Sequence, residues 1–126
     1  MSKLQSGSQT LTDQQQYKLT MNILFVCSRN KWRSRTAETI FKNNQKHSVK
    51  SAGTENDARI KVTGKLISWS DLIFVMEKKH RERLKEKFGS LTDSKEIIIL
   101  DIQDDYKYMD SELIEILETS VSLYLE

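Results

Sequence analysis

One cysteine and one arginine have the types and spacing that phosphate chemistry requires. Cys27 is the only cysteine of the 126-residue chain, and Arg33 follows it after five residues. Five intervening residues can wrap their backbone N–H groups around one tetrahedral oxyanion. Arg33 can then hold two phosphate oxygens with its planar guanidinium, and the positive field of such a loop favours the nucleophilic thiolate. The hydroxyl of Ser34 can donate a hydrogen bond to that thiolate.

A lone cysteine after an apolar run is also a common small core residue. The elements around Cys27 therefore have to decide between a core residue and a phosphate site. Asn22–Val26 is a short, continuous apolar run, typical of a buried parallel strand. Ala37, Ile40 and Phe41 have helical spacing and predict a helix over Ser34–Asn43. A loop between a strand and a helix N-terminus suits an anion, so this context favours the phosphate interpretation.

The rest of the chain alternates between strands and helices in the same way. The sequence predicts strands over Ser48–Ala52, Leu72–Met76 and Glu96–Leu100, helices over Thr63–Trp69 and Lys78–Phe88, and a last helix capped by Asp110. This alternation indicates an α/β fold with three α/β/α layers around a four-stranded parallel sheet. The phosphate loop lies between the first strand and the first helix, at the sheet edge where such folds bind ligands.

Residues 1–20 are predicted to be a flexible N-terminal tail, followed by a single domain over residues 21–126. The tail contains five glutamines and few large apolar side chains, too few to offset the entropy cost of ordering. The single cysteine excludes a disulfide framework and favours a reducing, cytoplasmic setting. No apolar run reaches the ~18 residues of a membrane span, so we expect no membrane partner.

Charge is unevenly distributed along the chain. Residues 1–100 carry 19 Lys and Arg against 10 Asp and Glu, whereas residues 101–126 carry eight acidic residues and one lysine. The basic part suits an anionic ligand. A solvated surface of uneven charge gives the same pattern, so charge alone does not settle the function.

Three segments resemble a known family, the low-molecular-weight protein tyrosine phosphatases. The motif V-C-x-x-N-x-x-R-S at positions 26–34 resembles their active-site loop. S-A-G-T at 51–54 is similar to the second signature of bacterial members, and D-L-I-F-V-M at 71–76 resembles their third strand. The resemblance spans residues 21–126 and suggests a short, divergent bacterial-type member.

The resemblance implies a role for each matching residue. Cys27 would be the nucleophile that forms a phosphocysteine intermediate, and Arg33 would bind phosphate and stabilise the transition state. Asn30 would hold the loop in a strained shape with a hydrogen bond to Ser51, and Ser34 would stabilise the thiolate. The phosphate-binding residues would be Ser28, Arg29, Asn30, Lys31, Trp32, Arg33 and Ser34.

The family's general acid is the Asp of an Asp-Pro-Tyr segment after the fourth strand, which corresponds here to Asp104-Asp105-Tyr106. The alignment selects Asp104, with Asp105 as the alternative, and an acidic loop without a catalytic role remains a third interpretation. Tyr106, Tyr108 and Trp32 either line the mouth and stack on an aryl group or are partly buried surface aromatics.

The chain departs from the family pattern within the loop and after it. Arg29 stands where the family has glycine, Trp32 where it has a second cysteine, and Arg35 where it has proline. An arginine at position 29 is expected to restrict the backbone where the loop approaches an anion. The segment after Thr54 is also much shorter than in typical members.

The sequence therefore predicts a cysteine-dependent phosphatase of phosphotyrosine or a similar aryl phosphate, in a phosphorylated protein or a small molecule. Its loop would also hold a free phosphate or sulfate ion, and we expect no metal, no other cofactor and no nucleic-acid partner. The alternative is a non-catalytic module on the same fold. Such a module would grip a phosphoprotein or a nucleic-acid backbone through Arg29, Lys31, Arg33, Lys42 and Lys46.

Overall fold

A computed structural model describes residues 20–43 and 46–125, so nearly all of the predicted tail lies outside the described residues. Four parallel strands form one sheet in the order β2-β1-β3-β4. They are β1 (Asn22–Cys27), β2 (Ser48–Gly53), β3 (Leu72–Val75) and β4 (Glu96–Ile99). The strand order reverses between β1 and β3, which is where such sheets bind their ligands. The predicted α/β class and four-stranded parallel sheet are confirmed.

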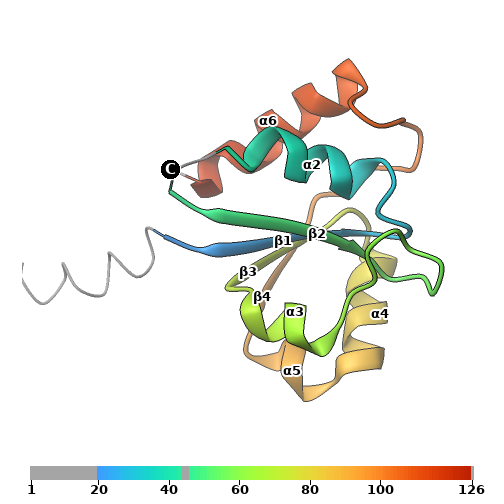
Figure 1. The fold of residues 1–126 in the computed structure, drawn as a ribbon, viewed down its shortest axis with the longest axis vertical. Coiled ribbons are helices and arrows are strands. Elements are labelled where there is room, and N and C mark those ends of the chain that lie inside the picture. The colour runs from blue at the N-terminus through green and yellow to red at the C-terminus, as the bar shows by residue number, and fades with distance from the viewer. Residues whose placement is uncertain (1–19, 44–45, 126) are drawn as a thin grey trace, which may run out of the picture.

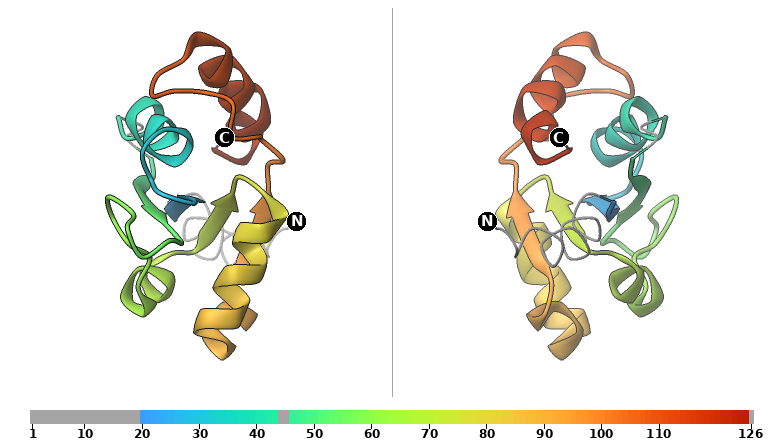
Figure 2. Two further views of the ribbon diagram at one scale, coloured as in Figure 1. Left: turned by 90° about the vertical axis from the view of Figure 1, so that its right-hand side faces the viewer. Right: turned by 90° about the vertical axis from the view of Figure 1, so that its left-hand side faces the viewer.

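Helices cover both faces of the sheet (Figures 1 and 2). On one face lie α2 (Arg33–Phe41) and α6 (Ser111–Leu125), and on the other lie α3 (Gly64–Trp69), α4 (Lys78–Phe88) and α5 (Ser90–Asp93). These are the three predicted layers. Within the described ranges, no helix is both long enough and apolar enough to cross a bilayer.

Each face of the sheet has its own apolar core, which is why β1 has no polar alternation. Toward α2 and α6, Phe25 stacks on Phe41 and Phe74 at ring distances of 5.8 and 5.1 Å. Toward α3 and α4, Leu24 and Val26 are fully buried in the second core. The two cores fix β1 at the centre of the sheet, with Cys27 as its last residue.

Neighbouring strands bring the second signature beside the loop. Cys27 pairs with Gly53 at the carboxyl edge, and Phe25 pairs with Ser51. A Cβ at Gly53 would lie 2.5 Å from the carbonyl oxygen of Ser28, so only a glycine leaves room for the loop. Strand β2 therefore supports the loop at close range.

The structure differs from the sequence expectations in a few details. Helix α2 begins at Arg33 and ends at Phe41, one and two residues earlier than predicted, and β1 extends to Cys27. The short α5 was not predicted, because four residues are too few to show a periodicity. Asp110 caps α6 as predicted, since its Oδ1 accepts the N–H groups of the second and third helical residues at 2.9 and 3.2 Å.

Candidate active site

A pocket of about 80 Å³ opens where β1 gives way to the loop before α2. Its walls are Cys27, Ser28, Arg29, Lys31, Trp32, Arg33 and Asp104. The structure thus brings one of the two candidate acids, from the far end of the chain, to the predicted phosphate loop. Asn30 and Ser34, which are fully buried, lie behind this surface and support it.

The carbonyls of residues 27–30 are turned away from the pocket. The carbonyl oxygens of residues 27–30 accept hydrogen bonds from the backbone N–H groups of residues 54, 55 and 59 and from the Arg59 side chain, at 2.9 to 3.1 Å. A trans peptide unit directs its N–H opposite to its carbonyl, so the N–H groups of residues 28–31 turn toward the pocket side. Such a run of N–H groups is an anion-binding nest.

Asn30 holds the tight turn of this loop. Its φ of 58° lies in the left-handed region, which asparagine tolerates better than most residues. Its side-chain Nδ2 donates to Ser34 Oγ at 2.7 Å and to Ser51 Oγ at 2.8 Å, and its backbone N–H donates to Cys27 Sγ at 3.2 Å. The turn is thereby tied to β2, to α2 and to the sulfur.

Arg29, which stands where the family has glycine, does not strain the loop. Among the described residues other than glycine, Asn30, Asp101 and Met109 have a positive φ, and Arg29 does not. The strained position falls one residue later, so a side chain at 29 costs no backbone strain. Arg29 extends into solvent, where its Nε lies 3.2 Å from Asp57 Oδ2.

The Cys27 sulfur has two hydrogen-bond donors close to it. It is 3% exposed and lies 2.9 Å from Ser34 Oγ. Because Ser34 Oγ already accepts from Asn30, its hydroxyl hydrogen remains to donate. The competing acceptor, the carbonyl oxygen of Ala52, is farther away at 3.4 Å, so the geometry directs that hydrogen to the sulfur. Two donors on one sulfur stabilise a thiolate.

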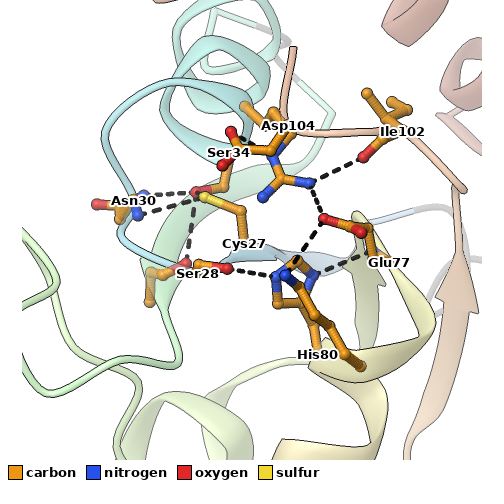
Figure 3. A network of polar contacts seen from close by, with 11 residues as sticks. Cys27, Ser28, Asn30, Ser34, Glu77, His80, Ile102 and Asp104 are labelled. Atoms are coloured by element: carbon orange, nitrogen blue, oxygen red, sulfur yellow. Dashed lines mark hydrogen bonds and ion pairs between the residues drawn. The ribbon is translucent and has the colours of Figure 1, made fainter. Parts of the chain in front are cut away.

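Arg33 is held by two residues that lie outside the loop, Glu77 and Ile102, which are labelled in Figure 3. It is 2% exposed, and its Nη1 donates to the carboxylate of Glu77 and, at 2.9 Å, to the carbonyl oxygen of Ile102. Its buried Nε has no hydrogen-bond partner within the described chain and lies 3.6 Å from Asp104 Oδ1. An N–H donor thus remains uncommitted at the pocket.

Sequence reasoning missed Glu77, although a signal was available. Glu77 lies two residues after the end of β3, at the carboxyl edge where ligands of such sheets bind. Burial alone would raise the pKa of Glu77, but the hydrogen bond and positive charge of Arg33, helped by Lys79 and His80, outweigh it and lower the pKa. Glu77 is therefore ionised and pairs with the arginine at neutral pH.

His80 also reaches the loop, from the first turn of α4. Its Nδ1 accepts the backbone N–H of Glu77 at 3.0 Å, and its Nε2 lies 2.9 Å from Ser28 Oγ. Burial, followed by the positive charge of Arg33, lowers the pKa of His80 to about 4. The ring is neutral at pH 7. The sequence placed His80 on a helix face but gave no sign of this contact.

The two adjacent aspartates lie in different places. Asp104 lines the pocket beside Cys27 and Arg33. Asp105 instead lines a separate hollow with Tyr106 and Ile116. Of the two acids that the alignment left open, the structure places the first within the site.

Of the three candidate aromatic residues, one lines the pocket and two do not. Trp32 lines the pocket and is 40% exposed. Tyr106 donates to Glu112 at 3.1 Å, and Tyr108 lies beneath the guanidinium of Arg35 at 4.4 Å. Neither tyrosine belongs to the pocket wall, as far as the described residues show.

The basic residues of the alternative binding module do not converge on one surface. Arg29, Lys31 and Arg33 line the pocket. Lys42, however, follows the far end of α2, and Lys46 lines a hollow with Asn22 at the amino ends of the strands. Such a spread does not favour a single nucleic-acid or phosphoprotein groove. Residues 20–43 and 46–125 contain no cluster of three or more His, Cys, Asp or Glu side chains suited to a metal ion.

Comparisons with known proteins match both the stretch that contains the loop and the fold. Residues 22–67 match the model of the family described as low molecular weight phosphotyrosine protein phosphatase, and a comparison with the curated proteins found no match. Among solved structures, Wzb from Vibrio vulnificus in complex with benzylphosphonate is 22% identical, with 82% of this chain and 96% of that chain covered and a TM-score of 0.64.

Two further structures share the fold. The tyrosine phosphatase Wzb from Escherichia coli K30, in complex with phosphate, is 25% identical, with 82% and 95% covered and a TM-score of 0.58. The YwlE arginine phosphatase from Geobacillus stearothermophilus is 22% identical, with 83% and 86% covered and a TM-score of 0.59. The family model matches the stretch that contains the phosphate loop and β2, which is less than half of the chain, and the solved structures show that the chain shares their fold.

Proposed function

We propose that this protein is a phosphatase that hydrolyses phosphotyrosine or a similar aryl phosphate through a phosphocysteine intermediate. One observation carries the proposal: the same small pocket holds the Cys27 sulfur, the nest of N–H groups, the buried Arg33 and the Asp104 carboxyl group. These are a nucleophile, two kinds of oxyanion donor and a proton donor, which together are the parts that phosphoryl transfer needs.

In the first step, the phosphate oxygens bind to the N–H groups of residues 28, 29 and 31 and to Arg33, while the Asn30 N–H donates to the sulfur. The Cys27 thiolate attacks phosphorus in line with the leaving oxygen. The S–P bond forms as the bond between phosphorus and the aryl oxygen breaks. Asp104 donates its proton to that oxygen, so the product leaves as a neutral phenol.

In the second step, the same groups act in reverse on water. The Asp104 carboxylate takes a proton from a water molecule, which attacks the phosphorus of the phosphocysteine. The S–P bond breaks and inorganic phosphate leaves. The returning thiolate accepts hydrogen bonds from Ser34 Oγ and from the Asn30 N–H, at 2.9 and 3.2 Å from the sulfur. These donors make the sulfur a better leaving group.

The pocket wall favours an aryl phosphate over a phosphoarginine. One structural relative is described as an arginine phosphatase, and the leaving group of phosphoarginine is a guanidine that carries positive charge when protonated. Here Lys31 lines the wall, and its positive charge would repel such a group. A phenyl ring can instead pack against the half-exposed Trp32. A phosphorylated protein or a small aryl phosphate fits this pocket.

A single-turnover assay with p-nitrophenyl phosphate tests the proposal. The wild type should release phenol in a burst, and an acid quench should trap a phosphoryl group on Cys27, the only cysteine of the chain. Cys27→Ser should show no burst and negligible turnover, while it still binds inorganic phosphate, because the nest and Arg33 remain. Normal turnover by Cys27→Ser would overturn the mechanism.

A parallel measurement with phosphoarginine tests the substrate class. We expect the kcat/KM for the aryl phosphate to exceed that for phosphoarginine at neutral pH. Equal or reversed values would show that Lys31 does not select against a cationic leaving group.

A further inference from the structure

The N-terminus of α4 contacts both ends of the phosphate loop. Glu77 is the N-cap residue, and its carboxylate accepts the backbone N–H of His80 as well as the guanidinium of Arg33. The His80 ring in turn accepts the Glu77 N–H and reaches Ser28, the residue next to the nucleophile. A capping box normally serves only its own helix, whereas this one also holds the first and the last parts of the loop.

The hydrogen bonds fix the tautomer of His80. A backbone N–H can only donate, so His80 Nδ1, which accepts from Glu77, carries no proton. In the neutral ring the proton is then on Nε2, which donates to Ser28 Oγ at 2.9 Å. Ser28 Oγ is the acceptor in this contact, so its own hydroxyl hydrogen remains to be donated elsewhere. Ser28 lines the pocket.

We propose that His80 is a positioning residue of the phosphate site, which orients the Ser28 hydroxyl so that it donates to a bound phosphate oxygen. This inference rests on the proposed function for the identity of the ligand. It adds one side-chain donor to the N–H nest and assigns to α4 a part in substrate binding. His80 acts by orientation and not by proton transfer, because it is 1% exposed and both ring nitrogens already have partners.

The charges around His80 agree with a ring that stays neutral. Arg33 of α2 faces it from the loop side, with Glu77, Lys79 and Arg83 from its own segment. Burial and Arg33 lower the pKa of His80 to about 4, so the Nε2–H tautomer persists across the neutral range. The orientation of Ser28 is therefore expected to be independent of pH between about 6 and 8.

The affinity of the whole protein for inorganic phosphate, measured by calorimetry, tests the proposal without any need for turnover. Ser28→Ala should weaken phosphate binding by about tenfold, as expected for the loss of one hydrogen bond to a charged group. Ser28→Thr keeps the hydroxyl and should retain most of the affinity. Ser90→Ala, at an exposed serine of α5, is the matched control and should change nothing.

A double-mutant cycle separates orientation from general damage. His80→Ala should weaken phosphate binding in the wild type but have little further effect in the Ser28→Ala background, because both changes remove the same donor. Effects that multiply, or a Ser28→Ala variant with unchanged affinity, would overturn the proposal. If either result were found while the wild type still hydrolysed an aryl phosphate normally, only the role of His80 would be overturned, and the proposed function would stand.

A spectroscopic signature covers the case in which His80→Ala does not fold. In the wild type, ¹⁵N spectra of the ring should show a neutral His80 with its proton on Nε2. That resonance should shift during a phosphate titration with the dissociation constant found by calorimetry. A proton on Nδ1, or no response to phosphate, would contradict the proposal.

Discussion

Asp104 and Asp105 are chemically identical neighbours that face different surroundings. Asp104 lies 3.6 Å from the Arg33 guanidinium in the pocket, whereas Asp105 lines a hollow near Tyr106. The positive φ of Asp101, 60°, turns the chain just before them. Which carboxyl group faces the nucleophile therefore depends on the path of the loop and not on residue type.

Replacement of the proposed acid should affect poor leaving groups most. We expect Asp104→Asn to lower kcat for a phenyl phosphate by a factor of about 10²–10³, within the range of general acid catalysis. A nitrophenyl phosphate, whose leaving group needs less protonation, should lose less. Asp105→Asn is the matched control and should stay within about twofold. Stopped-flow kinetics on both substrates checks this, and a larger loss in Asp105→Asn would reverse the assignment.

At the residue scale, sequence reasoning succeeds where the contacts are local. Cys27, Asn30, Arg33 and Ser34 lie within eight residues, and the spacing of Cys27 and Arg33 predicts that one loop brings both to the same pocket, as the structure has them. The groups outside the loop that hold Arg33, Glu77 and the Ile102 carbonyl, are 44 and 69 positions away. Spacing carries no information about such partners until the order of the strands is known.

At the scale of elements, the segment after β2 is the support of the loop. It donates to the carbonyl oxygens of residues 27–30, and Gly53 lets it approach, because a Cβ there would lie 2.5 Å from Ser28 O and 2.7 Å from Ala58 Cβ. The segment after Thr54 is shorter than in typical family members, yet it keeps the residues at 54–59 that support the loop.

A methyl group at Gly53 should disturb both folding and binding. We expect Gly53→Ala to lower the free energy of unfolding by about 1–3 kcal/mol, the usual cost of overpacking, and to weaken phosphate binding because Ser28 must move. Gly64→Ala is the matched control, since its Cβ would meet only Leu91 Cδ1 at 3.3 Å. Urea unfolding and phosphate titration measure the two effects. Wild-type stability and phosphate affinity in Gly53→Ala would contradict the conclusion that the close approach at Gly53 is needed to support the loop.

Helix α4 should leave a signature in the pH dependence of stability. The pKa of His80 is lowered from 6.5 to about 4 in the folded state. Between these values the unfolded chain binds the proton and the folded chain does not, so stability falls as pH decreases through this window, by at most about 1.4 kcal/mol per pH unit. Above pH 6.5 the group contributes no slope.

His80→Gln should remove this part of the slope, because glutamine does not titrate and is a normal third residue of a capping box. Urea unfolding of both proteins between pH 7 and 4.5 measures the difference. Parallel curves for wild type and variant would show that His80 takes up its proton equally in both states.

The longer strands and helices were predictable because their apolar residues repeat at a regular spacing, whereas α5 is too short to show a repeat. Buried strands and amphipathic helices repeat their apolar residues over several turns or strand pairs, and Lys78–Phe88 matched its predicted bounds. A single turn such as Ser90–Asp93 shows no repeat. Trp69 packs against the second core and is half-buried, with the Lys50 ammonium above its ring at 4.4 Å. From the sequence alone, a partly exposed tryptophan covered by a cation cannot be distinguished from a fully buried one.

At the scale of the whole molecule, the two ends of the sheet have separate tasks. The carboxyl ends of the strands carry the pocket, and the amino ends carry a structural clamp. There the buried His47 accepts the Met21 N–H on Nδ1 at 3.0 Å, and its Nε2 lies 3.0 Å from the Leu125 carbonyl oxygen. One ring thus ties the residue before β1 to the last turn of α6.

Loss of the clamp should separate stability from binding. We expect His47→Ala to lower the free energy of unfolding by about 1–3 kcal/mol, since it leaves buried polar groups unpaired, while the phosphate affinity stays unchanged. Thermal unfolding and calorimetry on the same sample measure both. A large loss of affinity in the folded variant would show that the two ends of the sheet are coupled.

The outward-facing carbonyls of residues 27–30 have one more consequence. In water, a charge that moves during a reaction must wait for solvent dipoles to turn, and that reorganisation is part of the barrier. Here the dipoles are peptide units, already fixed in orientation by the segment at 54–59. Phosphate can therefore gain and redistribute negative charge without waiting for its surroundings to rearrange.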